Sequence, residues 1–275
     1  MNAENKSSKQ KVVLITGASS GFGEVTASLL AQRGYRVFGT GRNPGRNRAW
    51  GYEMLPLDVR SDDSVRACVQ ELMERAGRLD VLISNAGYEL AGAVEETSIS
   101  EARDQFETNF FGAARMVKAA LPVMRKQGGG RILLVSSLAG LISVPFHGFY
   151  SASKYALEGY AEALRHEVKG FNISVSLIEP GFFRTNLARA ARNSTETVSE
   201  YAGMRERALK AFERAVQTGE DPGLVASLIL SVVESRSPRL RYRVGKDAKR
   251  LPRIKALVPE SAFEAGVRRN FHLDG

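Results

Sequence analysis

The strongest chemical signal in the chain is a tyrosine and a lysine whose spacing places both on one face of a helix. Tyr150 and Lys154 are four residues apart, which is about one helical turn. A phenol with a pKa of about 10 is a poor acid–base catalyst at neutral pH, and a nearby ammonium lowers that pKa by stabilising the phenolate. The pair predicts a tyrosine that exchanges protons, although an ordinary amphipathic helix also accounts for one tyrosine and one lysine.

A second signal is a run of glycines between an apolar segment and an amphipathic one. Thr16–Gly23 has the sequence TGASSGFG. Glycines at such a turn let the backbone approach a pyrophosphate, which the N-terminus of the following helix stabilises. The spacing G-x-x-x-G-x-G matches the common G-x-G-x-x-G pattern only loosely. The run predicts a dinucleotide site, with a plain glycine-rich turn as the alternative.

The same run also fits the G-x-S-x-G elbow of serine hydrolases, with Ser19 as the nucleophile. His272 near the C-terminus satisfies the chain order of nucleophile, acid and histidine. The elbow would follow the first strand, however, so no earlier strand could supply the loop that completes the oxyanion hole. Gly23 would also have no role. The hydrolase is therefore the less favoured alternative.

The elements that must position these residues alternate along the chain. Amphipathic stretches predict helices after Gly21, from Ser98 or Ser100, and over Ser151–Val168. Short apolar segments between them predict strands buried on both faces, namely Val12–Ile15, Arg36–Thr40, Val81–Ser84, Ile132–Ser136 and Ile173–Ile178. The alternation predicts an α/β, single-domain, Rossmann-type fold, with a doubly wound parallel sheet and helices on both faces.

The expected organisation is one domain, because no repeat and no Pro-, Gly- or Ser-rich linker divides the chain. Residues 1–10 predict a flexible N-terminal tail ahead of a dinucleotide-binding catalytic domain over residues 11–275. Residues 185–217 are rich in Ala and Arg and read as helical, departing from the strict alternation. Because an insertion after a late strand commonly covers the site, we expect this segment to be a substrate lid.

Composition excludes several classes of protein. Of 275 residues, 43% are hydrophobic and 25% are charged, as in ordinary soluble globular proteins. The single cysteine, Cys68, cannot form an intrachain disulfide, and with three histidines it leaves little for a metal site, so we expect no metal. The polar N-terminus lacks a signal-peptide core, and the apolar stretch Leu224–Val233 is about half of what spans a bilayer. A cytoplasmic protein is expected.

The net charge of +9 is concentrated in one late segment. Between Arg236 and Lys255, nine basic residues accompany one acid, Asp247. A nucleic-acid groove more commonly draws basic residues from several elements, so we expect a solvated basic surface and no nucleic-acid partner. Residues 236–258 also contain interleaved apolar residues and could lie on an anionic membrane, but Pro252 is expected to interrupt a helix there.

Taken together, these residues are similar to the short-chain dehydrogenase/reductase family, in order from about Lys11 to Thr185. Thr16–Gly23 resembles the family's glycine-rich cofactor motif. Residues 84–87 have the sequence SNAG and resemble its Asn-Asn-Ala-Gly element, with Ser84 in place of the first Asn. Asp58 is similar to the acid that contacts the adenine ring, and Pro180-Gly181 followed by Thr185 resembles the segment that holds the nicotinamide carboxamide.

The resemblance implies a catalytic tetrad of Asn109, Ser137, Tyr150 and Lys154. Tyr150 would exchange a proton with the substrate oxygen, which Ser137 would orient. Lys154 would bind the nicotinamide ribose and lower the pKa of Tyr150, and Asn109 would hold a water that links Lys154 to solvent. The implied cofactor-binding residues are Thr16, Gly17, Ser19, Ser20, Gly21, Phe22, Gly23, Arg42, Asp58, Val59, Asn85, Ala86, Gly87, Tyr150, Lys154, Pro180, Gly181, Phe183 and Thr185.

The end of the second strand predicts which nicotinamide cofactor is preferred. An NAD site usually has an acid there for the ribose 2′-hydroxyl. Here the strand closes with Thr40, Gly41 and Arg42, and a guanidinium suits a 2′-phosphate. We therefore expect NADP(H) rather than NAD(H).

Apolar residues downstream of the motifs predict a hydrophobic ketone or secondary alcohol as the small-molecule substrate. The candidates are Leu138, Leu141, Ile142, Val144, Phe149, Phe182 and Phe183. The region Arg241–Lys246 resembles the 17-beta-hydroxysteroid and retinol dehydrogenase-like branch. The resemblance also implies a homodimer or homotetramer formed through the helices that carry Asn109 and Tyr150.

The expected function is hydride transfer between NADP(H) and such a substrate, with Tyr150 as general acid and base. An alternative from another class is a non-catalytic dinucleotide-binding sensor. A sensor would keep the glycine turn but would have no reason to keep the four tetrad residues together.

Overall fold

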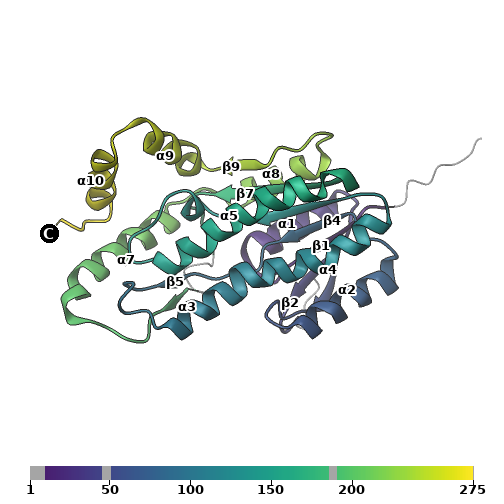
Figure 1. The fold of residues 1–275 in the computed structure, drawn as a ribbon, viewed down its shortest axis with the longest axis horizontal. Helices are drawn as coiled ribbons and strands as arrows, with labels where there is room; N and C mark the ends of the chain where they lie inside the picture. Colours follow the sequence, from purple (N-terminus) through teal and green to yellow (C-terminus); the bar gives the residue numbers. More distant parts are fainter. Residues whose placement is uncertain (1–9, 45–50, 186–190, 275) are drawn as a thin grey trace, which may run out of the picture.

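The apolar segments form the strands of one parallel sheet, which is the centre of the molecule (Figure 1). The structure is a computed structural model that describes residues 10–44, 51–185 and 191–274. In the described residues the sheet has seven strands in the order β3-β2-β1-β4-β6-β7-β9. They are β1 (Val12–Ile15), β2 (Arg36–Gly41), β3 (Glu53–Pro56), β4 (Val81–Ser84), β6 (Gly130–Val135), β7 (Ile173–Pro180) and β9 (Arg241–Val244).

The five predicted strands are confirmed, and two further strands of this sheet were missed. β7 extends two residues beyond the prediction, to Pro180, whereas β6 begins at Gly130 and ends at Val135. The missed strands, β3 and β9, are the two edges of the sheet. An edge strand has only one neighbour and keeps polar side chains. The sequences EMLP and RYRV therefore lack the apolar run that identifies a central strand.

Helices cover both faces of the sheet, as the two faces of β1 require. Val12 and Leu14 pack with α2 (Asp62–Ala76), α4 (Gly112–Lys126) and α5 (Gly148–Val168). Val13 and Ile15 point the other way and pack with α1 (Gly21–Gln32) and α8 (Gly223–Glu234). Because successive strand residues alternate in direction, both faces are buried. The predicted doubly wound α/β fold is confirmed.

The predicted helix from Ser98 contains a local irregularity. Ser98 caps α3 (Ile99–Phe106) through a capping box with Glu101. The chain then passes through a π-helical turn, η1 (Glu107–Phe111), before it continues as α4. A π turn holds one extra residue and is a common feature of functional sites. The hydrophobic pattern predicted one long helix and gave no sign of this turn.

The segment predicted as a helical lid is only partly helical. Residues 186–190 lie outside the described residues, as do residues 1–9 of the predicted tail. Arg192–Asn193 forms β8, which pairs in parallel with β5 (Leu90–Ala91). The helical part consists of a short 3-10 turn, η4 (Ser199–Tyr201), and α7 (Ala202–Gln217). The prediction of helix throughout is wrong, because the backbone of residues 192–194 bonds instead to Glu89 and Ala91.

The C-terminal part forms two helices at the margin of the molecule, α9 (Lys246–Leu257) and α10 (Glu260–Asn270), drawn in yellow in Figure 1. Pro252 lies inside α9, so the prediction that it would interrupt a helix is wrong. A proline removes one N–H and strains the turn before it, and Ala248, fully buried in an apolar cluster, anchors that turn. No helix in the described ranges is long and apolar enough to cross a membrane.

Two of the basic residues in the late segment belong to an ion-pair network. Arg241 pairs with Glu158, Glu162 and Glu179, and Arg243 pairs with Glu179. Glu179 is fully buried, and burial, with the charge of Glu158, raises its pKa to about 7. Part of the basic segment is therefore neutralised where β9 meets β7 and α5, so the expected solvated basic surface excludes these two residues.

A half-buried arginine joins β6 to the end of α8, and this contact predicts a stability effect. The Arg131 guanidinium donates to the carbonyls of Val232, Val233 and Ser235, and the Val232 carbonyl also accepts from the Ser235 N–H. We expect Arg131→Met to lower the free energy of unfolding by about 2–3 kcal/mol, because the charged donor that joins these three carbonyls to β6 is lost. The measurement is urea unfolding.

The matched control is Arg66→Met on the exposed surface of α2, where Arg66 pairs only with Asp63. Exposed pairs contribute under about 1 kcal/mol. Equal losses in the two variants would contradict the role given to Arg131.

Candidate functional site

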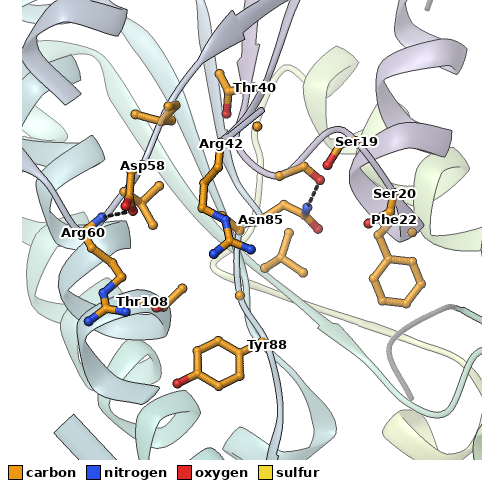
Figure 2. Close-up of a pocket in the computed structure, with 18 of the residues that line it drawn as sticks. Ser19, Ser20, Phe22, Thr40, Arg42, Asp58, Arg60, Asn85, Tyr88 and Thr108 are labelled. Atoms are coloured by element: carbon orange, nitrogen blue, oxygen red, sulfur yellow. Dashed lines mark hydrogen bonds between the residues drawn. The ribbon is translucent and has the colours of Figure 1, made fainter. Parts of the chain in front are cut away.

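The principal pocket lies at the carboxyl ends of β1, β2 and β4 and has a volume of about 340 Å³ (Figure 2). From β1 the chain builds the sheet toward β3 on one side and toward β9 on the other. A doubly wound sheet binds its ligands at such a switch point. The residues that line the pocket are Gly17, Ser19, Ser20, Gly21, Phe22, Thr40, Gly41, Arg42, Leu57, Asp58, Val59, Arg60, Asn85, Ala86, Gly87, Tyr88, Thr108, Val135, Ser136, Tyr150, Lys154, Thr185 and Arg192.

The glycine-rich turn forms one wall of this pocket. Gly17 and Gly21 have φ angles of 67° and 57°, in the left-handed region that glycine adopts without strain. A Cβ at Gly23 would collide with the Gly17 carbonyl oxygen and lie 2.6 Å from Nδ2 of Asn85. Ser20 at the start of α1 makes no side-chain cap, so its hydroxyl does not compete for the first N–H groups of the helix. Such a helix end fits an anion.

Hydrogen bonds between the ends of β1 and β4 hold this turn in place. The buried Thr16 hydroxyl accepts from the backbone N–H groups of Asn85 and Ala86, both at 2.9 Å. The Asn85 side chain donates to the carbonyls of Thr16 at 3.0 Å and Gly17 at 3.2 Å. Thr16 therefore lies behind the pocket and shapes it without lining it.

Cationic and polar side chains line the opposite wall. Figure 2 shows the Arg42 side chain extending across the middle of the pocket, with Ser19 on one side and Asp58 on the other. Oδ1 of Asp58 accepts from the backbone N–H of Arg60 at 3.0 Å. Arg192 of β8 lies over the Tyr88 ring, 4.7 Å from its centroid. The guanidinium groups of Arg42 and Arg192 thus suit a phosphate, whereas that of Arg60 pairs with Asp104 at 2.5 Å.

Tyr150 and Lys154 line the pocket, and Ser137 lies beside Tyr150 just outside the lining. Tyr150 and Lys154 are 7% and 6% exposed. Nζ of Lys154 is 5.9 Å from the centroid of the Tyr150 ring and donates to the Val135 carbonyl at 3.0 Å. Ser137 follows β6, and its side chain lies close enough to the Tyr150 phenol to lower the pKa of that phenol. The spacing argument is confirmed in that both side chains share one helix face and reach one pocket.

The expected net lowering of the Tyr150 pKa is not seen in this structure. Burial raises the pKa of Tyr150 above its ordinary value, and the negative charge of Glu89 raises it further, while the hydrogen bond with Ser137 lowers it. Burial lowers the pKa of Lys154 to about 8, against the charge of Glu158. Desolvation dominates both groups because each is almost wholly removed from water.

Asn109 lies in the π-helical turn and faces inward, 2% exposed. Its Oδ1 accepts from the Tyr88 N–H at 3.0 Å, and its Nδ2 donates to the Tyr88 carbonyl at 2.9 Å and to Ser153 at 3.3 Å. An added Cβ at Gly87 would lie 3.1 Å from Oδ1 of Asn109 and 3.8 Å from Nζ of Lys154. Asn109 is therefore beside Lys154, with its amide fixed by the backbone that follows β4.

Several predicted site residues lie outside the pocket lining. Phe183 is 3% exposed and packs edge-on against Phe22, at 5.6 Å between ring centroids. Gly181 donates to the Val244 carbonyl beside α9. Among the described residues, the lining also omits Thr16, Gly23, Asn109, Ser137 and Pro180. These residues support the pocket from behind.

Other lining residues were not predicted from the sequence. Arg60 follows the predicted Asp58-Val59 pair, and Tyr88 follows the Asn-Ala-Gly element, so both adjoin motifs. Arg192 had no sequence signal, because only the pairing of β8 with β5 brings it to the pocket. The remaining unpredicted lining residues are Thr40 and Gly41, which entered only the cofactor argument, and Leu57, Thr108, Val135 and Ser136.

The residues proposed for a hydrolase are not brought together. Ser19 lines the pocket at the start of α1. His272 follows α10, and its carbonyl accepts from Arg207 of α7. Among the described residues, no histidine lines the pocket that contains Ser19.

One apolar cluster contains Tyr150, and another contains Leu138, which follows Ser137. Val144, Tyr150 and Phe271 pack with α7 through Ala208 and Phe212. Leu138 and Ile142 pack with Phe182 and with Ala248 of α9. Four of the seven predicted apolar candidates therefore lie in these clusters, whereas Phe183 belongs to the core beneath α1 and α8.

Comparison with known proteins places the chain among oxidoreductases. The family model of short chain dehydrogenases matches residues 11–196. The chain is 40% identical over 261 residues to a 3-ketodihydrosphingosine reductase of Bacteroides thetaiotaomicron, with 94% of this chain and 97% of that protein covered. It is 36% identical over 275 residues to retinol dehydrogenase 8 of Bos taurus, with 92% of this chain and 87% of that protein covered.

Solved structures agree with these matches. A short-chain dehydrogenase from Streptomyces avermitilis is 35% identical with a TM-score of 0.80, and the match covers 94% of this chain and 96% of that one. A short chain dehydrogenase/reductase from Burkholderia phymatum in complex with NAD is 26% identical with a TM-score of 0.76 and covers 94% and 92%.

The junction between β1 and β4 predicts a clear difference between two substitutions. Thr16→Val keeps the shape of the side chain but leaves two part-buried N–H groups without an acceptor. We expect it to lower the free energy of unfolding by about 2–4 kcal/mol, measured by urea unfolding. Thr16→Ser keeps the hydroxyl and should cost markedly less. If the valine and serine variants were equally stable, the two hydrogen bonds would not be the source of the junction's stability.

Proposed function

The chain belongs to the short-chain dehydrogenase/reductase family and is an NAD(P)-dependent oxidoreductase, and from this premise we propose that it transfers a hydride between NADP(H) and a hydrophobic ketone or secondary alcohol. The observation that carries the proposal is that Tyr150 and Lys154 line one pocket with Ser137 beside Tyr150. A non-catalytic sensor would give no reason for this arrangement.

The residues of the glycine turn fit a dinucleotide. Gly17 and Gly21 bring the backbone to the pocket wall, and the start of α1 offers N–H groups to a pyrophosphate. Asp58 and Val59 would hold the adenine ring, Asn85 to Gly87 the middle of the molecule, and Pro180, Gly181 and Thr185 the carboxamide. The nicotinamide supplies or accepts the hydride when the cofactor is bound.

The protein's own groups would handle the proton. Tyr150 would give its phenolic proton to a carbonyl oxygen in reduction and take it back in oxidation, and Ser137, beside Tyr150, would orient the same oxygen. Lys154 would bind the ribose hydroxyls and favour the phenolate as a nearby cation. Asn109, beside Lys154, would hold a water that carries protons to solvent.

The preference for NADP(H) is supported by residues of this chain. Arg42 extends across the pocket just after β2, with Thr40 and Gly41 beside it in the lining (Figure 2). A guanidinium binds a 2′-phosphate by charge-assisted hydrogen bonds. A related solved structure holds NAD, so the preference depends on Arg42 and not on the family.

The apolar clusters beside Tyr150 support a hydrophobic substrate. Two relatives are named for the substrates 3-ketodihydrosphingosine and retinol, which are a ketone and an alcohol.

Residues 185–217 would form a lid over the substrate, since α7 packs against the cluster that contains Tyr150. We also propose a homodimer or homotetramer through the helical segment that carries Asn109 and through α5, which carries Tyr150. The assay that tests the function follows NADPH absorbance with a panel of hydrophobic ketones, and no turnover on any of them would contradict it.

Removing the phenolic hydroxyl separates proton transfer from cofactor binding. We expect Tyr150→Phe to lower turnover at least about 100-fold, because general acid–base catalysis contributes that much or more. The NADPH dissociation constant should change little. Tyr155→Phe, on the same helix and more exposed, is the matched control. Near-wild-type turnover by Tyr150→Phe would refute the proton-transfer role.

Removing the guanidinium beside β2 tests the choice of cofactor. We expect Arg42→Ala to raise the NADPH dissociation constant about 10- to 100-fold, the effect of losing a charge-assisted hydrogen bond, and to leave that of NADH within about twofold. Isothermal titration measures both. Arg66→Ala, outside the pocket on α2, should change neither. Tighter binding of NADH than NADPH by the unaltered protein would overturn the preference.

A further inference from the structure

The part of the basic segment that follows the ion-pair network of β9 forms one face of α9. Five exposed residues fall within about 100° of the helix circumference, since an α-helix turns once in about 3.6 residues. They are Lys246, Lys249, Arg250, Arg253 and Leu257. We call this set the outer face of α9, because α9 lies at the edge of the molecule (Figure 1).

The opposite side of α9 packs onto the body of the protein. Ala248 is fully buried, and Leu251 packs in the same apolar cluster. Nζ of Lys255 donates to the Leu141 carbonyl at 3.2 Å, so this lysine reaches back to the body of the protein and does not belong to the outer face. These contacts fix the rotation of the helix and direct the outer face to solvent.

Neighbouring acids leave most of the outer face uncompensated. Asp247 is the one acid of α9, and it faces the end of β7, because a Cβ at Gly181 would lie 3.4 Å from the Asp247 Cβ. Glu220 accepts from the backbone N–H of Lys246 and so lies at the first turn only. Within the described part of the chain, Lys249, Arg250 and Arg253 form no ion pair. α10 has two acids and two arginines and adds no net charge.

Leu257 indicates which partner the outer face fits. It is 84% exposed, more than any other large apolar side chain in the described ranges, and it ends the row of basic residues. The phosphates of a nucleic acid offer nothing to such a leucine. The interface of an anionic bilayer takes both groups, with basic side chains at the lipid phosphates and an apolar side chain below them.

The inner side of α9 places this face close to the candidate substrate region. Ala248 packs with Leu138 and Ile142, and Leu138 directly follows Ser137. A bilayer on the outer face would therefore be separated from these residues by the thickness of one helix, about 10 Å. Hydrophobic ketones and alcohols dissolve in the hydrocarbon of a bilayer, because water excludes their apolar surface.

We propose that the outer face of α9 is a binding surface for an anionic lipid bilayer, with Lys249, Arg250 and Arg253 at the lipid phosphates and Leu257 inserted beneath them. Bound in this way, the enzyme takes its hydrophobic substrate from the membrane that dissolves it. The uptake of substrate rests on the proposed function, whereas the binding to lipid does not.

The test is cosedimentation of the full chain with vesicles, either of phosphatidylcholine alone or of equal parts of phosphatidylcholine and phosphatidylglycerol. We expect binding to the mixed vesicles only, weakened by added salt, which screens exposed charges. The triple variant Lys249→Gln, Arg250→Gln, Arg253→Gln should bind about 100-fold more weakly, since each basic residue at an anionic surface contributes about fivefold. Leu257→Ser should bind about 10-fold more weakly, because the apolar contact is lost.

The matched control removes three exposed basic side chains from α1, α2 and α4, and so changes the net charge by the same amount. It is the triple variant Arg33→Gln, Arg66→Gln, Lys126→Gln. Its binding to mixed vesicles should stay within about twofold, because the removed charges lie away from the surface. Urea unfolding should be similar for all variants, since exposed substitutions change stability little. Equal weakening by the two triple variants, or equal binding to both kinds of vesicle, overturns the proposal.

A nucleic-acid partner would give another pattern. A DNA duplex is titrated with the same proteins at the same salt concentration. Tighter binding of the duplex than of the mixed vesicles, or vesicle binding by Leu257→Ser that equals that of the unaltered protein, also overturns the membrane surface.

Kinetics separate this inference from the proposed function. The triple variant of α9 should lower kcat/KM for a ketone dissolved in mixed vesicles and leave kcat/KM for a water-soluble ketone unchanged. An equal loss for both ketones contradicts uptake from the membrane. If the vesicle results are as expected and no ketone is turned over, the proposed function fails and the membrane surface stands.

Discussion

The hydrogen bonds between Thr16 and Asn85 are the interaction on which the rest of the site depends. β1 and β4 are neighbours in the sheet, but the chain leaves them in opposite directions, so their ends would separate without a direct link. The Thr16 hydroxyl and the Asn85 amide close this gap with four bonds. The glycine turn, the start of α1 and the backbone up to Tyr88 all take their positions from that junction, and Asn109 extends it through Tyr88 to the helices beyond.

The sequence predicted the parts of the fold whose environment is uniform. Central strands such as β1 and β4 are buried on both faces, so their composition alone identifies them. The strands β3 and β9 were not predicted, because each lies at an edge of the sheet and has a mixed composition. Pro252 was misjudged for a related reason: the local rule counts the lost hydrogen bond, whereas the burial of Ala248 against distant residues holds the helix together.

The residues of the candidate site divide in the same way into those that the local sequence predicted and those whose properties depend on distant parts of the chain. The glycines of Thr16–Gly23 and the Tyr150–Lys154 pair could be found because their chemistry depends on neighbours within a few residues. The acidity of Tyr150 could not be predicted. Helical spacing places an ammonium near the phenol, but it says nothing of desolvation or of the carboxylate of Glu89, which is distant in the sequence. Arg192 likewise reaches the pocket only through the short pairing of β8 with β5, which no periodicity records.

The π-helical turn between α3 and α4 carries a further consequence. Its extra residue rotates the following helix relative to the preceding one, so that the Asn109 amide faces Tyr88 while Phe111 remains 47% exposed. Deleting one residue there would give a regular α-helix and would rotate the Asn109 amide away from Tyr88. A regular helix and a correctly placed Asn109 amide are therefore conflicting requirements for this segment. Selection for thermal stability alone would favour the regular helix.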